Sequence, residues 1–172
     1  MLSDVQMKRD ATTGSFPFLD VFMGFEALEA VRSMFGDKTE KVLTDLRVDI
    51  QARPGYLRVD DETGNIVISG EYLRTGDERY LYLDVVHELV HVRQFIEGKE
   101  LFDRRYSYVD RPTEIEAYQA CVAEGRKIGM ENDEVLEYLR VEWITEEEFG
   151  RLLASVGVKP KKTPERPKKS GA

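Results

Sequence analysis

The chain has 172 residues, 41% of them hydrophobic, so it is long enough to bury the core of one domain, and its net charge of −8 argues against nucleic acid as a main partner. Its one cysteine, Cys121, excludes an internal disulfide, and no stretch is long and apolar enough to predict a membrane span. The first ten residues lack the apolar run of a signal peptide, so we expect a cytoplasmic protein.

The beginning of the chain is expected to be a flexible N-terminus over residues 1–14, followed by a single domain over residues 15–157. Apolar residues recur every three or four positions from Phe18 to Phe35, which predicts an amphipathic helix that ends at Gly36. A second, short helix is expected over residues 37–46. The domain should therefore begin with helices.

Three strands are expected next, over residues 47–51, 56–59 and 65–69, because polar and apolar residues alternate in these segments. A Pro-Gly turn at 54–55 separates the first two strands, and a turn at 61–64 separates the last two. This order along the chain predicts a small, mostly antiparallel sheet in which each strand pairs with the next one.

A long helix is predicted over residues 78–97, with Asp77 as its N-cap and Gly98 directly after its end. Its apolar residues cover most of the helix circumference, which is typical of a helix at the centre of a domain. The two histidines of the chain, His87 and His91, both lie in the middle of this helix.

The C-terminal part is expected to be helical. After a polar, aromatic loop over residues 99–112, helices are predicted from Pro112 to about residue 128, then over 133–139 and 145–156, the last with a Thr-x-x-Glu capping box. From Lys159 onward the chain has six basic residues, three prolines and no large apolar residue, so residues 158–172 are expected to form a basic, disordered tail.

The segment His87-Glu88-Leu89-Val90-His91 carries the clearest chemical signal in the sequence. On a helix the two histidines lie only about 40° apart around the axis, one turn along, so both imidazoles can reach one metal ion. Glu88 lies about 60° from His91 on the same side, where a carboxylate can take a proton from a metal-activated water. The spacing therefore predicts a hydrolytic metal site.

A catalytic zinc usually has three protein ligands, and two carboxylates on the following helix could supply the third. Glu114 shares its helix face with the small residues Ala117 and Cys121, which would let the two helices approach closely. We therefore favour Glu114, with Glu116 as the alternative metal ligand. Cys121 lies about 10 Å along the helix from Glu114, too far for both to bind one ion.

The histidine motif, followed 23 residues after His91 by Glu114-Ile115-Glu116-Ala117, resembles the gluzincin clan of zinc metallopeptidases, and the modest size is similar to its minigluzincins. The resemblance covers roughly residues 65–125. It implies a zincin-type fold with a mixed sheet, in which an edge strand binds the substrate above the motif helix. It also implies that His87, His91 and Glu114 bind one Zn²⁺ per chain and that Glu88 is the general base.

Gluzincins usually have a tyrosine or histidine that stabilises the oxyanion, and this chain has no third histidine. Tyr106, Tyr108 and Tyr118 are the available candidates, and the sequence does not choose among them. Asp103 or Asp110 could orient a ligand histidine through its second nitrogen, although each is more typical of surface charge.

The sequence thus predicts an α+β, zincin-like domain with a helical N-terminus, a small mostly antiparallel sheet, a central motif helix and C-terminal helices. The expected function is that of a cytoplasmic zinc metallopeptidase that hydrolyses peptide bonds in a peptide or protein substrate. Two alternatives remain: a zincin-fold binding or regulatory module with little or latent activity, and a metallohydrolase that acts on a non-peptide amide.

Overall fold

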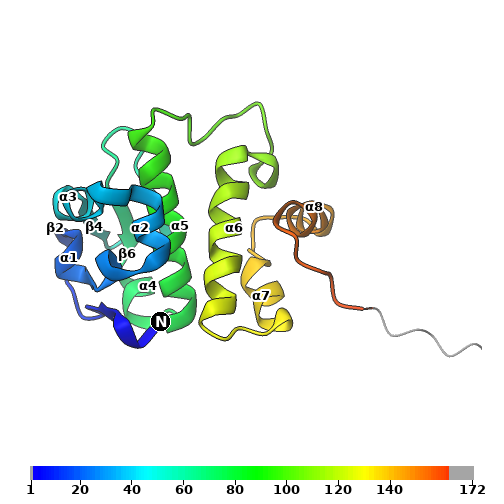
Figure 1. Cartoon of the computed structure of the whole chain (residues 1–172), viewed down its shortest axis with the longest axis horizontal. Helices are drawn as coiled ribbons and strands as arrows, with labels where there is room; N and C mark the ends of the chain where they lie inside the picture. Colours follow the sequence, from blue (N-terminus) through cyan, green and yellow to red (C-terminus); the bar gives the residue numbers. More distant parts are fainter. Residues whose placement is uncertain (1, 163–172) are drawn as a thin grey trace, which may run out of the picture.

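The long helix α5 (Glu78–Ile96) lies at the centre of the molecule, between an N-terminal part that contains the sheet and a C-terminal group of helices (Figure 1). The structure is a computed structural model that describes residues 2–162. Its class is α+β, as predicted. Within these residues, no helix combines the length and the apolar character that crossing a bilayer would require.

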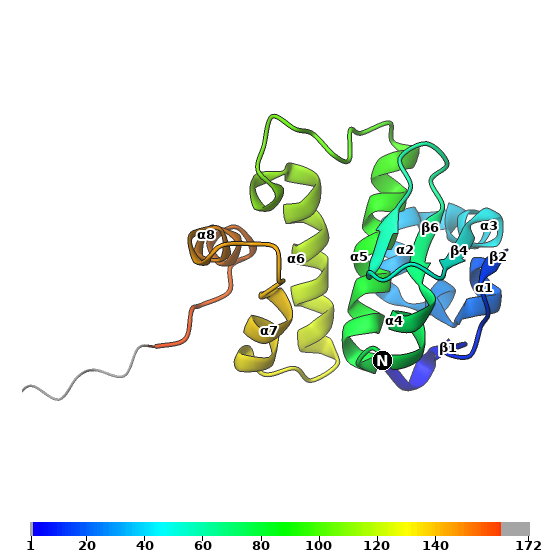
Figure 2. The same ribbon diagram turned by 180° about the vertical axis from the view of Figure 1, so that it is seen from behind.

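The main sheet has four strands in the order β2-β4-β6-β5. The outer pairs, β2–β4 and β6–β5, are antiparallel, whereas β4 and β6 are parallel. The strands have the bounds β2 Gly14–Pro17, β4 Arg47–Gln51, β5 Leu57–Val59 and β6 Ile66–Ser69. The sheet is therefore mixed, and β5 is one of its two edge strands (Figure 2).

The predicted strand order was wrong, because β6 lies between β4 and β5 instead of following β5 at the edge. All four residues of β6 are buried, which fits a central strand that is covered on both faces. The continuous apolar run Ile66-Val67-Ile68 already carries this signal in the sequence. Strand β2, which completes the sheet, was not predicted.

The predicted single helix from Phe18 to Phe35 is broken into α1 (Phe18–Val21), the short strand β3 (Phe22–Met23), a 3₁₀ turn and α2 (Glu29–Phe35). The break is at Gly24, which has a φ of +89°. A Cβ atom there would lie 2.3 Å from the carbonyl oxygen of Asp4. Phe18, Phe22 and Phe25 are buried in the core, but the backbone between them turns.

The predicted flexible N-terminus was also wrong for residues 2–14, because this segment packs against the domain. Strand β1 (Gln6–Met7) pairs with β3, and Val5 and Ala11 are buried. The Arg9 guanidinium donates hydrogen bonds to the carbonyls of Leu73 and Gly76. A short polar segment gives no periodic signal, so this packing was not visible in the sequence.

The remaining helices agree with the prediction to within one or two residues, apart from the short α4, which was not predicted. Asp77 accepts hydrogen bonds from the backbone N–H groups of Arg79 and Tyr80 and so caps α5. Thr145 and Glu148 form the predicted capping box. The helices are α3 Thr39–Asp45, α4 Gly70–Thr75, α6 Pro112–Lys127, α7 Asn132–Leu139 and α8 Glu146–Val156.

Helix α6 runs beside α5 in the opposite direction, and α7 and α8 pack on its far side (Figures 1 and 2). Val158, which the prediction placed in the tail, is buried against the core. The rest of the predicted basic tail from residue 163 lies outside the described residues. The α5–α6 pair is the part of the fold that positions the site.

Candidate metal centre

Helices α5 and α6 bring two histidines and one glutamate together at their interface. The Nε2 atoms of His87 and His91 lie 3.0 Å apart, and they lie 3.1 Å and 3.4 Å, respectively, from Oε2 of Glu114. All three side chains are buried. This group could hold a metal ion. A set of two imidazoles and one carboxylate leaves one position of a tetrahedral site open, as catalytic sites require.

Glu114 reaches the histidines from the first turn of α6, where the positive end of the helix dipole stabilises a carboxylate. Burial by itself would raise the pKa of Glu114, but hydrogen bonds with His87 and His91 hold it well below its ordinary value. The Glu114 carboxyl is therefore ionised at neutral pH, as a metal ligand would have to be. Burial also opposes a charge on His87, yet hydrogen bonds with Cys121 and Glu114 raise its pKa.

Glu116, the alternative ligand, does not face the histidines. It accepts a hydrogen bond from Nε2 of Gln94 and forms an ion pair with Arg93. Both partners lie in the C-terminal part of α5, and Glu116, two residues after Glu114, is on a different face of α6 from Glu114 and Ala117. Of the two carboxylates, only Glu114 belongs to the buried group that could hold a metal.

Gln94 fixes the orientation of His91, a role that the sequence did not reveal. Its Nε2 donates to the carbonyl oxygen of Thr113 at 3.0 Å and to Glu116 at 2.7 Å, and both partners are acceptors only. Its Oε1 must therefore face Nδ1 of His91, 2.7 Å away, so this nitrogen carries the proton. In the neutral imidazole the lone pair of His91 is then on Nε2, which points toward Glu114 and His87 and is the nitrogen that an ion would bind.

His87 has a sulfur atom as its second partner. Its Nδ1 lies 3.8 Å from Sγ of Cys121, and the thiol donates to the carbonyl of Leu83. The two aspartates considered for this role are used elsewhere: Asp103 binds Arg105, and Asp110 binds Arg151. Neither aspartate orients a ligand histidine.

Glu88 lies on the open side of the cluster. It is buried, and its Oε2 has no hydrogen-bond partner among the described residues. Burial is the main cause that raises its pKa, against the lowering effect of the two histidines. Glu88 and His87 are both among the residues that line one cavity of about 240 Å³. A buried carboxylate oxygen without a partner is positioned to accept a proton from a bound molecule.

The three tyrosines considered as oxyanion donors lie in different environments. The hydroxyls of Tyr108 and Tyr118 are 2.8 Å apart, and both residues line the cavity beside His87. Burial is the main cause that raises the pKa of both phenols, so both are protonated donors at neutral pH. Tyr106 is exposed and does not line the cavity.

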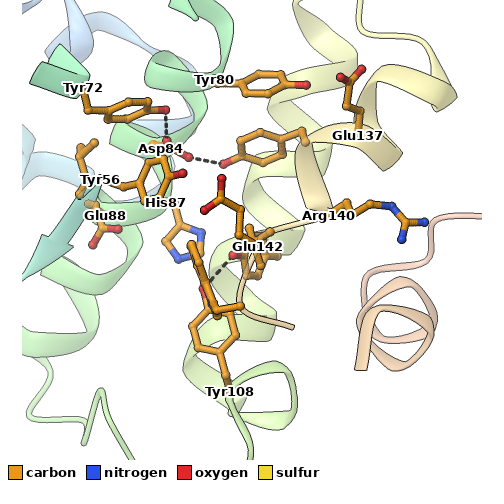
Figure 3. A pocket seen from close by; sticks show the side chains of 15 residues that line it. Tyr56, Tyr72, Tyr80, Asp84, His87, Glu88, Tyr108, Glu137, Arg140 and Glu142 are labelled. Atoms are coloured by element: carbon orange, nitrogen blue, oxygen red, sulfur yellow. Dashed lines mark hydrogen bonds between the residues drawn. The ribbon is translucent and has the colours of Figure 1, made fainter. Parts of the chain in front are cut away.

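The rest of the cavity extends along α5 toward its N-terminus (Figure 3). Asp84, one turn before His87, accepts hydrogen bonds from the hydroxyls of Tyr72 and Tyr138. Its position three residues before His87 is a sequence signal that it shares a helix face with the motif. Its tyrosine partners come from α4 and α7, and no local pattern predicts them.

A comparison of the chain with models of protein families, with curated proteins and with solved structures found no match. No family is therefore assigned, and the functional argument depends on the geometry of the site.

Proposed function

We propose that the chain is a zinc-dependent metallopeptidase of the gluzincin type, which hydrolyses a peptide bond with Glu88 as the general base. The observation that carries the proposal is the buried His87–His91–Glu114 cluster with the unpartnered carboxylate oxygen of Glu88 beside it, at a cavity. When bound, zinc would lower the pKa of a water to about 7 and polarise the substrate carbonyl.

The protein groups have separate roles in this mechanism. His87, His91 and Glu114 hold the ion, and Gln94 keeps Nε2 of His91 unprotonated for it. Glu88 takes the proton from the water that attacks the scissile carbonyl and then delivers it to the leaving amine. The hydroxyl of Tyr108 or Tyr118 donates a hydrogen bond to the oxygen of that carbonyl as negative charge develops there.

The edge strand β5 supports a peptide as the substrate. Only one side of β5 is paired with another strand of the sheet, and both Leu57 in β5 and the preceding Tyr56 line the cavity. An extended peptide can add to such an edge through main-chain hydrogen bonds. This arrangement supports the substrate-binding edge strand that the resemblance to zincins implies.

One observation favours the second candidate, a module with latent activity. The connection between α7 and α8 carries Trp143, whose ring lies 5.9 Å from that of Tyr56 and 5.8 Å from that of Tyr108. Trp143 therefore joins two walls of the cavity and narrows the access to it. Under this alternative, Trp143→Ala raises turnover of long peptides.

The test combines metal content with hydrolysis. We expect elemental analysis of the purified chain to find one zinc, and Glu114→Gln or His87→Ala to lose it. Glu88→Gln should keep zinc but hydrolyse a mixed peptide library about 100- to 10,000-fold more slowly, which mass spectrometry measures. Glu62→Gln, in an exposed turn, is the matched control. If neither the zinc-loaded wild type nor the zinc-loaded Trp143→Ala variant cleaves any peptide, the proposal of a peptidase is rejected.

A further inference from the structure

The cavity beside the metal centre is lined mainly by aromatic rings. Besides Tyr108 and Tyr118, the rings of Tyr56, Tyr72 and Tyr80 contribute to it, as do those of Tyr138 and Trp143. Aromatic faces carry negative charge density and attract cations as well as apolar groups. Its volume of about 240 Å³ is below the roughly 300–1,000 Å³ of sites for drug-sized ligands, so it fits a single side chain.

The charged groups of the lining are almost all acidic. Asp84, Glu88, Glu137 and Glu142 contribute to it, and none of them forms an ion pair with another described residue. Arg140 is the one arginine or lysine among the residues that line the cavity. Its guanidinium binds Glu146 and lies 4.1 Å from the centre of the Phe149 ring, so it is directed away from the cavity (Figure 3).

The positions of these carboxylates suit one cation inside the cavity. Each oxygen of Asp84 accepts one tyrosine hydroxyl, which uses only two of its roughly four lone-pair sites. Glu142 comes from the opposite wall and is directed toward the centre of the lining in Figure 3. Glu137 comes from α7, and its carboxylate lies near the Tyr80 ring in Figure 3. An acidic guest would add a like charge beside these carboxylates, whereas a basic side chain would meet charges of opposite sign.

We propose that this cavity binds the positively charged side chain of a lysine or arginine that lies next to the scissile bond of the substrate. The position of this side chain next to a scissile bond rests on the proposed function. The binding of the cation in the cavity does not. The aromatic rings contact the methylene groups of the side chain, and Asp84, Glu137 and Glu142 neutralise its charge.

The test uses N-acetylated peptides that differ at one position on either side of the cleaved bond, with lysine, arginine, norleucine or glutamate there. We expect kcat/KM for the lysine and arginine peptides to exceed that of the norleucine peptide at least about tenfold, with the glutamate peptide lowest. Glu142→Gln together with Glu137→Gln should reduce this preference several-fold. The Glu62→Gln control should leave it unchanged.

A second readout separates this inference from the proposed function. Trp143 is the only tryptophan in the chain and lines the cavity, so its fluorescence reports binding without hydrolysis. If no peptide is cleaved, the peptidase proposal fails, but tighter binding of the lysine and arginine peptides still supports the basic side-chain site. Equal rates or affinities for lysine and norleucine overturn it. So does a preference that appears only when the amino terminus is left unacetylated, because the cation is then the terminal ammonium.

Discussion

The sharpest test of the metal centre is the substitution Gln94→Ala, because Gln94 touches neither the expected ion nor the substrate. Its Oε1 is the only hydrogen-bond partner of Nδ1 of His91 among the described residues. Glu116 and the carbonyl of Thr113 both keep other partners, the ion pair with Arg93 and the helical hydrogen bonding of α6. The main effect should therefore fall on His91.

Loss of a partner that orients a ligand histidine typically weakens metal binding about 10- to 100-fold. This factor corresponds to about 1.4–2.7 kcal/mol. Without the Gln94 oxygen as acceptor, the proton of His91 can move from Nδ1 to Nε2. The tautomer that results has no lone pair on Nε2 for the ion. Gln94→Ala should therefore lower zinc affinity by this factor and reduce hydrolysis at limiting zinc, whereas saturating zinc should restore most of the activity.

Zinc affinity can be measured by competition with a chromophoric chelator, and folding can be checked separately by urea denaturation. The matched control is Gln119→Ala, which removes an exposed glutamine of α6 that donates to the carbonyl of Ser155. An affinity for zinc that is the same in Gln94→Ala, Gln119→Ala and the wild type would refute the assigned tautomer of His91.

Three further outcomes are expected. Removing zinc with a chelator should lower the melting temperature by on the order of 10 °C, because an ion at about 1,000 times its dissociation constant stabilises the fold by about 4 kcal/mol. An unchanged melting temperature in calorimetry would contradict a resident ion. Tyr108→Phe or Tyr118→Phe should lower kcat roughly 100-fold with zinc content unchanged if that hydroxyl stabilises the oxyanion, so steady-state kinetics of both variants identify the donor. Gly24→Ala should destabilise the fold by at least about 1 kcal/mol, because φ of residue 24 is +89° and the new Cβ would overlap the Asp4 carbonyl. An unchanged midpoint of urea denaturation would contradict this packing.

Much of the metal centre could be predicted from the sequence because its geometry is set by helix periodicity. The four-residue spacing of His87 and His91 fixes their common face, and the small residues Ala117 and Cys121 distinguish the face of Glu114 from that of Glu116. Those inferences need no knowledge of the rest of the fold. The role of Gln94 is of the same kind, because it lies three residues after His91, but its partners on α6 become evident only from the structure.

The parts that could not be predicted depend on contacts between segments far apart in the sequence. Strand β6 pairs with both β4 and β5, and although its apolar run is typical of a central strand, that run does not specify which strands flank it. The cavity likewise combines residues of β5, α4, α5, α6 and the α7–α8 connection. Its acidic, aromatic character is a property of this assembly, and the net charge of the chain gave no indication of where the negative charge would gather.

The close packing of α5 and α6 connects the core of the domain to the chemistry of the site. Ala117 and Cys121 are completely buried, and Sγ of Cys121 lies 3.3 Å from the carbonyl oxygen of Leu83 on α5. These small residues set the helix separation, and this separation places Oε2 of Glu114 within 3.4 Å of both histidine nitrogens. A larger side chain on this face of α6 would force α6 away from α5, because the close-packed interface has no space for it. The distances within the His87–His91–Glu114 cluster are therefore determined by packing residues that are not part of it, and the site should be rigid wherever this interface is intact.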